Sequence, residues 1–202
     1  MMPRVVVLLA ALLLCAGCVP RKVPDARFVL QGEAASPKAT FFLRQYIDRD
    51  PGSKGERQLW VREKTGESYF LFRYFRIAQV VISPDEDCLV INDRRSGNEA
   101  GIVLCRRETG GRFAPVSRPD LDALAWKRFQ RDLQGDGRTV PEFSHHYVWC
   151  PRWIDGTSFV VSLQGYGDEG LVEHWAYFYD MKTGGLIPDP QNNLKYVELP
   201  VQ

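Results

Sequence analysis

The stretch SPDEDCLVINDRRSGNEAGIVLCRRETGG, residues 83–111, contains two apolar runs separated by turn-forming residues. Pro84-Asp85 is typical of a turn, because proline presets φ and aspartate accepts turn geometry. The run CLVIN that follows is apolar and β-branched on both parities, which suits a strand buried on both faces. The stretch therefore predicts a hairpin unit that lies between other sheets.

This unit recurs along the chain. When the sequence is shifted by 70 positions, Leu89-Val90-Ile91 aligns with Phe159-Val160-Val161. The closing Thr109-Gly110 recurs at Thr183-Gly184 and, upstream, at Thr65-Gly66. Self-similarity at about 40 residues is typical of four-stranded repeat units. The sequence predicts an all-β, mainly antiparallel fold of about three four-stranded units, with an open stacked β-sandwich as the alternative.

The turn, the apolar strand and the Thr-Gly hairpin resemble the repeats of TolB-type β-propellers, most closely over residues 80–116 and less so over 146–188. Glu86 is a departure, because these repeats usually have glycine there. The resemblance implies propeller-like blades but no particular activity, since such folds serve many functions. Propellers have about four to eight blades, so three units imply a ring that is open or is completed by a second copy of the chain.

One helix is predicted as an insertion between the two clearest units, over about residues 117–135. Ser117 is expected to cap it and Gly135 to end it. Apolar residues repeat every four positions at Leu121, Ala125, Phe129 and Leu133. This stripe is expected to pack on the sheets, with a partner-binding groove as the alternative.

Residues 1–17 are typical of a secretory signal peptide, because Arg4 precedes an apolar run over residues 5–14 and small residues follow it. The run is too short to span a bilayer, which takes about 20 residues. The sequence therefore predicts export, and residues 18–24 are expected to be a tether before a single domain at 25–202.

Ala16-Gly17-Cys18 resembles the lipobox of bacterial lipoproteins, although Cys15 stands where leucine is usual. The resemblance implies a lipid such as palmitate on Cys18 and anchoring to the cell envelope. Val19 rather than aspartate follows, which implies the outer membrane and its periplasmic side. A plain secreted protein is the alternative.

Charge limits the partners of the mature chain. Removing the first 17 of 202 residues leaves 185, with 25 of the 26 basic side chains balanced by 25 acidic ones. Nucleic-acid binding calls for a basic face, so a nucleic-acid partner is not expected. A chain of this length can bury about 70% of its unfolded surface, enough for one substantial core.

The cysteines of the domain raise the question of a disulfide. If Asn92 pairs with Gly101 across the loop, Cys88 lies opposite Cys105. An oxidising compartment then allows a cross-strand disulfide. A pair of buried free thiols is equally compatible with this pairing, and Cys150 would remain unpaired.

Binding is expected at two loops, residues 93–100 and 165–173, which form a rim if they meet. The candidate rim residues are Asp93, Arg94, Asn98, Glu99, Tyr166, Asp168 and Glu169. Trp175, Tyr177 and Tyr179 share one strand face and are expected to pack in the core. If that face is exposed instead, it would offer a stacking platform for cell-wall sugars.

No motif in the sequence specifies a reaction or calls for a cofactor. His145 and His146 would point to opposite faces of a strand, so a metal site is not expected. The favoured hypothesis is a non-catalytic, membrane-anchored module that binds another envelope protein or a second copy of itself. The alternatives are a glycan-binding lipoprotein and a metal-dependent hydrolase built on His145, His146, His174 and Asp168.

Overall fold

The fold is known from a computed structural model, which describes residues 23–50, 52, 54–168, 170–189 and 197–198. The strands are β1 (Phe28–Ala35), β2 (Phe41–Asp48), β3 (Arg57–Glu63), β4 (Ser68–Tyr74), β5 (Ile77–Ile82), β6 (Cys88–Arg94), β7 (Glu99–Arg107), β8 (Phe113–Pro115), β9 (His145–Trp149), β10 (Ser158–Gly167), β11 (Gly170–Asp180), β12 (Gly185–Pro188) and β13 (Val197–Glu198). The helix α1 spans Leu121–Gly135. Within these described ranges, no helix is long and apolar enough to cross a bilayer. The predicted mainly antiparallel β class is confirmed.

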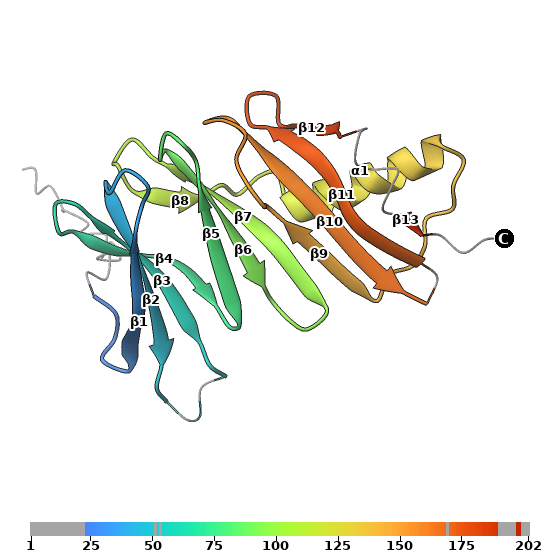
Figure 1. Cartoon of the computed structure of the whole chain (residues 1–202). Helices are drawn as coiled ribbons and strands as arrows, with labels where there is room; N and C mark the ends of the chain where they lie inside the picture. Colours follow the sequence, from blue (N-terminus) through green and yellow to red (C-terminus); the bar gives the residue numbers. More distant parts are fainter. Residues whose placement is uncertain (1–22, 51, 53, 169, 190–196, 199–202) are drawn as a thin grey trace, which may run out of the picture.

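The strands form two sheets rather than three separate units (Figure 1). The first sheet has the order β1-β2-β3-β4. The second has the order β12-β11-β10-β9-β7-β6-β5, with β8 paired to β7 and β13 to β11. Its two antiparallel runs, β5 to β8 and β9 to β12, are joined by a parallel contact in which Glu99 faces His146 and Ala100 faces Tyr147. Among the described strands, neither sheet closes on itself.

The predicted repeat corresponds to the last hairpin of each four-stranded run. Thr65-Gly66 lies between β3 and β4, Thr109-Gly110 between β7 and β8, and Thr183-Gly184 between β11 and β12. Gly66 and Gly184 have φ values of 91° and 67°, a region that glycine enters without a steric penalty. In the β7–β8 turn it is the next residue, Gly111, that has positive φ, at 77°. Each of the three turns therefore contains one glycine that its backbone conformation calls for.

Strand β6 is buried on both faces, as its apolar sequence predicts. Cys88 and Val90 belong to the core shared with α1 and the strands β9 to β12. Leu89 and Ile91 point the other way, into the core shared with the first sheet. The β5–β8 run is therefore the middle layer of the molecule.

The register between β6 and β7 differs by one residue from the expected one. Asn92 faces Ile102 rather than Gly101, so Cys88 faces Arg106 and Cys105 faces Leu89. A shift of one residue moves a side chain to the other face of a sheet. The expected pairing of Cys88 with Cys105 is wrong, and both are buried free thiols, as is Cys150.

Helix α1 begins three residues later than its expected cap would place it. Asp120, not Ser117, is the N-cap, and its carboxylate accepts hydrogen bonds from the N–H groups of Asp122 and Ala123. Pro119 explains the shift, because a proline disfavours the helical conformation of the residue before it. The expected apolar stripe is buried, which confirms that this face packs in the core: Leu121, Ala125, Phe129 and Leu133.

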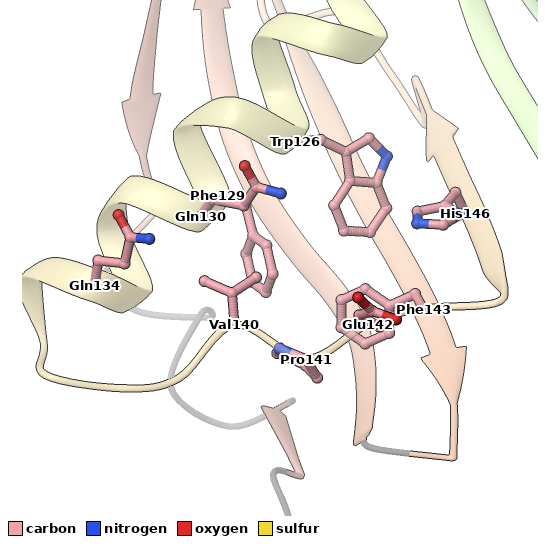
Figure 2. A pocket seen from close by; sticks show the side chains of 9 residues that line it. All are labelled: Trp126, Phe129, Gln130, Gln134, Val140, Pro141, Glu142, Phe143 and His146. Carbon is pink, nitrogen blue, oxygen red and sulfur yellow. The ribbon is translucent and has the colours of Figure 1, made fainter.

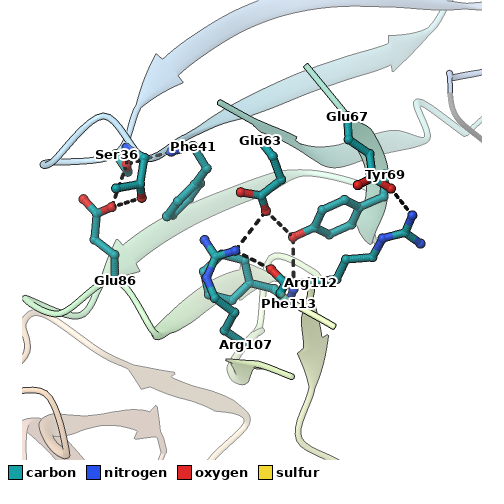
Figure 3. Close-up of polar contacts among 11 residues, drawn as sticks. Ser36, Phe41, Glu63, Glu67, Tyr69, Glu86, Arg107, Arg112 and Phe113 are labelled. Carbon is teal, nitrogen blue, oxygen red and sulfur yellow. Dashed lines mark hydrogen bonds and ion pairs between the residues drawn. The ribbon is translucent and has the colours of Figure 1, made fainter. Parts of the chain in front are cut away.

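Glu86 connects the turn between β5 and β6 to the first sheet (Figure 3). Its carboxylate accepts hydrogen bonds from the Ser36 hydroxyl at 3.0 Å, the Lys38 N–H and the Thr40 hydroxyl. Its φ is 68°, a value that normally favours glycine. The chain thus keeps the backbone of a glycine turn and uses the side chain to hold the two sheets together.

A second polar contact joins the same two layers near Arg107 (Figure 3). Arg107 Nη1 and the Tyr69 hydroxyl both donate to Glu63 Oε1 at 3.0 Å. The Phe113 N–H in turn donates to the Tyr69 hydroxyl at 3.0 Å. Burial raises the pKa of Tyr69, so its hydroxyl stays neutral and serves as both donor and acceptor.

Candidate functional site

The two expected rim loops meet at strand β9. The Tyr147 hydroxyl donates to the carbonyl of Gly97 at 2.6 Å, and it lies 3.1 Å from the Tyr166 hydroxyl. The rings of His145 and Tyr166 stack with their centroids 4.1 Å apart and an interplanar angle of 17°. We call Arg94, Asn98, His145, Tyr147 and Tyr166 the rim cluster.

Backbone pairing fixes the positions in the rim cluster. His145 and Tyr147 alternate with His146 along β9, so they share one face and His146 takes the other. Tyr166 lies directly opposite His145 on β10. The His146 N–H donates to the carbonyl of Asn98 at 2.9 Å. The cluster is therefore held by three strands and the loop between β6 and β7.

Apart from Arg94 and Asn98, the side chains of the rim cluster are aromatic. The Tyr166 side chain is 43% exposed. The hydrogen bond to Tyr166 raises the pKa of Tyr147, partial burial adds to this, and Arg94 acts in the opposite direction. The Tyr147 hydroxyl therefore stays protonated and able to donate a hydrogen bond at neutral pH, beside the exposed Arg94 and Asn98.

Asp93 is not an exposed rim residue, contrary to expectation. It is 8% exposed, and its Oδ1 has no hydrogen-bond partner within the described part of the chain. Burial raises the pKa of Asp93, while Arg95, whose Nε lies 3.8 Å from Oδ2, opposes this. Arg95 also pairs with Glu99 at 3.0 Å and with Asp122 at 2.8 Å. Asp93 and Glu99 therefore belong to an ion-pair group that links the loop to α1.

The structure describes only one of the three remaining predicted site residues. Asp168 is exposed in the turn between β10 and β11, at the same ends of the strands as Tyr166. Glu169 and the predicted lipid-attachment residue Cys18 lie outside the described residues.

The aromatic stripe of β11 is buried, as expected. Trp175, Tyr177 and Tyr179 are 4%, 0% and 3% exposed. The Tyr177 hydroxyl donates to Asp132 Oδ2 on α1 at 2.9 Å. A sugar cannot reach this face, so the stacking platform considered for these three residues is wrong.

The histidines do not form the constellation that a hydrolase would need. His145 and His146 lie on opposite faces of β9, and His174 lies on β11. Across the described ranges, no three His, Cys, Asp or Glu side chains are grouped so that they could hold a metal ion.

A pocket of about 470 Å³ lies on the other face of β9, between α1 and the segment that leads into the strand (Figure 2). It is lined by Trp126, Phe129, Gln130, Gln134, Val140, Pro141, Glu142, Phe143 and His146. The rings of Trp126 and His146 are 5.2 Å apart, edge to face, and Trp126 and Phe143 are 5.7 Å apart. Strand β9 thus separates the rim cluster from this pocket.

The pocket and the place of Tyr147 were not predicted from the sequence. Tyr147 could have been found from its phase with His145 in the strand HHYVW. The pocket had one signal, the alternating glycines of QGYG at Gly165 and Gly167, because glycine in a strand often marks a close approach of other chain segments.

Comparison with known proteins adds little to this geometry. No protein-family model matches the chain, and no curated protein matches it. Among solved structures, the chain is similar to TolB from Acinetobacter baumannii, with a TM-score of 0.39 and 14% identity. The match covers 82% of this chain and 33% of TolB, so the chain spans about a third of that protein's length.

Proposed function

We propose that this protein is an exported, lipid-anchored module of the bacterial envelope that binds another envelope protein through its rim cluster. The observation that carries the proposal is the meeting of the β6–β7 and β10–β11 loops at Tyr147, which donates to Gly97 and contacts Tyr166. Exposed tyrosine beside arginine is typical of the residues that dominate protein interfaces. A partner would find three aromatic side chains, His145, Tyr147 and Tyr166, together with Arg94.

The anchor is proposed from the sequence of the first 18 residues. The tether at 18–24 can span at most about 25 Å, so the domain would stay close to the membrane surface. Two acyl chains would hold it stably, since a single chain gives only marginal binding. The Cys18→Ser variant should lose its acyl mass and move from the membrane to the soluble fraction. A Cys18→Ser chain that stays membrane-bound would contradict the anchor.

The rim cluster is tested by site-specific photo-crosslinking in intact cells. A photoreactive residue at Tyr166 should give one adduct of defined mass, and the additional substitution Arg94→Glu should abolish it. Lys182, exposed in the β11–β12 turn at the opposite end of β11, is the matched control position and should give none. Equal labelling from both positions, or none from Tyr166, would contradict the proposal. An adduct with a second copy of the chain would identify a homo-oligomer.

The proposal also includes a propeller architecture, in which the two sheets are divided into three blades. The three consecutive antiparallel runs, each ending in a Thr-Gly hairpin, support an assignment as blades of an open propeller. If a second copy completes the ring, light scattering should give twice the mass of the chain. If the protein is a monomer at all concentrations, the ring is open.

A second candidate function, binding to cell-wall glycan, is supported by the stack of His145 on the exposed Tyr166. Aromatic side chains on a surface can stack on sugar rings. The chain should then sediment with insoluble peptidoglycan, and Tyr166→Ala should prevent this. Sedimentation that does not depend on Tyr166 would remove this candidate.

A further inference from the structure

The described chain begins at one end of the first sheet (Figure 1). Phe28 starts β1 and faces Asp48 at the end of β2, so residues 23–27 lie at this end. The proposed tether, residues 18–24, joins the domain here and spans at most about 25 Å. A lipid on Cys18 would therefore hold this end of the domain closest to the membrane.

Two other segments of the chain lie at the same end (Figure 1). The first links β2 to β3, because β3 starts where β2 ends and Ile47 faces Arg57. The second links β4 to β5, because Tyr74 at the end of β4 also faces Arg57 and β5 starts only three residues later. We call the described residues at this end the tether end: 23–27, 48–50, 54–57 and 73–77.

The tether end exposes apolar side chains. Phe75 is 49% exposed and Ile77 is 55% exposed, and they lie on either side of the exposed Arg76. Val23, where the tether joins the domain, is 70% exposed. An exposed apolar patch among polar residues marks a contact with a protein or with a membrane. Surface elements that lie in the headgroup region of a bilayer combine apolar side chains with lysine and arginine.

Three basic side chains of the tether end have no anionic partner. Arg49, Lys54 and Arg76 are exposed, and within the described part of the chain none of them forms an ion pair or a side-chain hydrogen bond. Basic side chains near a membrane surface are attracted to anionic lipid headgroups. The free cations therefore favour a lipid surface as the partner of the apolar side chains beside them.

The acidic residues of the tether end do not cancel its positive charge. Asp48 pairs with Arg27 at 3.5 Å, and Glu56 pairs with Arg73 at 3.0 Å. Asp25 and Asp50 accept hydrogen bonds from backbone N–H groups. The tether end has six basic side chains and four acidic ones: Arg27, Arg49, Lys54, Arg57, Arg73 and Arg76 against Asp25, Asp48, Asp50 and Glu56.

The turns at the opposite end of the same strands have the opposite balance. These turns connect β1 to β2, β3 to β4, β5 to β6 and β7 to β8. Together they contain three basic and five acidic side chains: Lys38, Lys64 and Arg112 against Glu67, Asp85, Glu86, Asp87 and Glu108. The charge of these strands is therefore arranged with its positive side toward the tether.

We propose that the tether end is a membrane-contact surface, where Phe75 and Ile77 enter the headgroup region and the free cations bind anionic headgroups. This inference rests on the lipid anchor proposed above and goes beyond it, because it fixes the orientation of the domain. The rim cluster begins beside this surface, since Arg94 faces Ile77 across β6 and β5. A protein bound to the rim cluster would therefore also lie at the membrane surface.

The test uses two isoleucines of nearly equal exposure. Ile77 belongs to the tether end, whereas Ile187, which is 57% exposed, follows the turn at the far end of β11. A photoreactive residue replaces each of them in the full chain, and intact cells are illuminated. The variant at Ile77 should gain the mass of one phospholipid, and the variant at Ile187 should not. Equal lipid labelling from both positions, or a protein adduct from Ile77, would overturn the proposal.

The mass of the chain before illumination tests the anchor separately. If the acyl groups are present and Ile77 gives no phospholipid adduct, the anchor stands and the membrane-contact surface is overturned. If the acyl groups are missing and Ile77 still gives this adduct, the surface stands and the anchor is contradicted.

Charge reversal tests the role of the cations in vesicles of phosphatidylcholine, with and without phosphatidylglycerol. Arg49→Glu combined with Arg76→Glu should lower the phospholipid adduct of Ile77 about 5-fold when phosphatidylglycerol is present, and much less in phosphatidylcholine alone. Lys64→Glu combined with Lys182→Glu is the matched control, because it changes the net charge equally in turns far from the tether. An equal loss from both pairs would mean that net charge alone attracts the lipid, and would overturn the proposal.

Discussion

The side-chain amide of Asn92 makes both hydrogen bonds that a neighbouring strand would make to Cys150. Its Nδ2 donates to the Cys150 carbonyl at 2.9 Å, and its Oδ1 accepts from the Cys150 N–H at 2.7 Å. Both residues are 0% exposed. Trp153 strengthens the same junction, because its Nε1 donates to the Val81 carbonyl at 2.9 Å. The parallel backbone pairing of β7 with β9 joins the β5–β8 and β9–β12 runs over only two residue pairs. Hydrogen bonds from side chains extend this junction.

Replacement of Asn92 should be among the most destabilising changes in the chain. Asn92→Leu leaves the N–H and the carbonyl of Cys150 unpaired in the core, and each such group costs about 1–3 kcal/mol. We expect a loss of about 2–5 kcal/mol in the free energy of unfolding, measured in urea. A loss below about 1 kcal/mol would mean that the amide is not a structural link.

Asn92→Asp serves as the companion variant. When ionised, the carboxylate that this substitution introduces could accept from the Cys150 N–H but could not donate to the Cys150 carbonyl. Protonation restores a donor, so this variant should regain stability relative to the parent as the pH falls, whereas Asn92→Leu should not.

Substitutions of Glu86 should separate backbone strain from the hydrogen bonds of its carboxylate. Glu86→Ala loses the three hydrogen bonds and keeps the unfavourable φ, and we expect a loss of about 2–4 kcal/mol. Glu86→Gly loses the same bonds but removes a strain of about 1–2 kcal/mol. The glycine variant should therefore be more stable than the alanine variant and less stable than the parent. Unfolding in urea measures all three, and the reverse order of the two variants would contradict this account.

The contribution of Glu86 should disappear in acid. Burial by itself raises the pKa of Glu86, but hydrogen bonds from Thr40, the Lys38 N–H and Ser36 outweigh it and hold the pKa below the ordinary 4.5. The folded state therefore binds its proton less readily than the unfolded state, and the stabilisation is complete above pH 4.5 and is lost as the pH falls through the folded pKa. The difference in unfolding free energy between the parent and Glu86→Gln should be constant above pH 4.5 and should shrink as the pH falls below it; a difference that stays constant in acid would refute the link.

Gly167 should not tolerate even a methyl group. A Cβ there would meet backbone atoms, the Glu142 oxygen at 2.8 Å and the Ser144 nitrogen at 3.1 Å. Backbone must then shift, which costs about 1–3 kcal/mol. Gly110→Ala is the control, because a Cβ at Gly110 meets nothing within 4 Å, and it should change stability by less than about 0.5 kcal/mol. Equal melting temperatures for the two variants would show that the segment before β9 yields easily.

The sequence predicted those features that arise from local pattern. The Thr-Gly hairpins, the doubly buried β6 and the apolar stripe of α1 all follow from turn chemistry or from side-chain periodicity, and the structure confirms them. The sequence did not predict features that depend on loop geometry. The β6–β7 register differs by one residue because the loop around Gly97 determines which residues pair, and no periodicity reports on that loop.

In the candidate site, too, the sequence predicted what local pattern determines and missed what loop geometry determines. The sequence left open whether the two loops meet, and the structure brings them together at Tyr147. Asp93 is buried beside Arg95, because β6 extends two residues beyond the expected run CLVIN, to Arg94. The pocket was missed because residues 136–144 have no periodic pattern; their position depends on contacts with Gly165 and Gly167, which are far away in sequence.

The parallel contact between β7 and β9 has a consequence for how this surface can change. Two parallel neighbours cannot be joined by a tight turn, so the chain has to travel back along the molecule before it can start β9. Residues 116–144, including α1, make that return, and most of the pocket wall belongs to them. Among the described strands, the sheet pairings include none of residues 117–144. The side chains of this connector that line the pocket can therefore vary while every sheet keeps its register. The returning segment is the part of the molecule in which new binding chemistry can arise without redesign of the β framework.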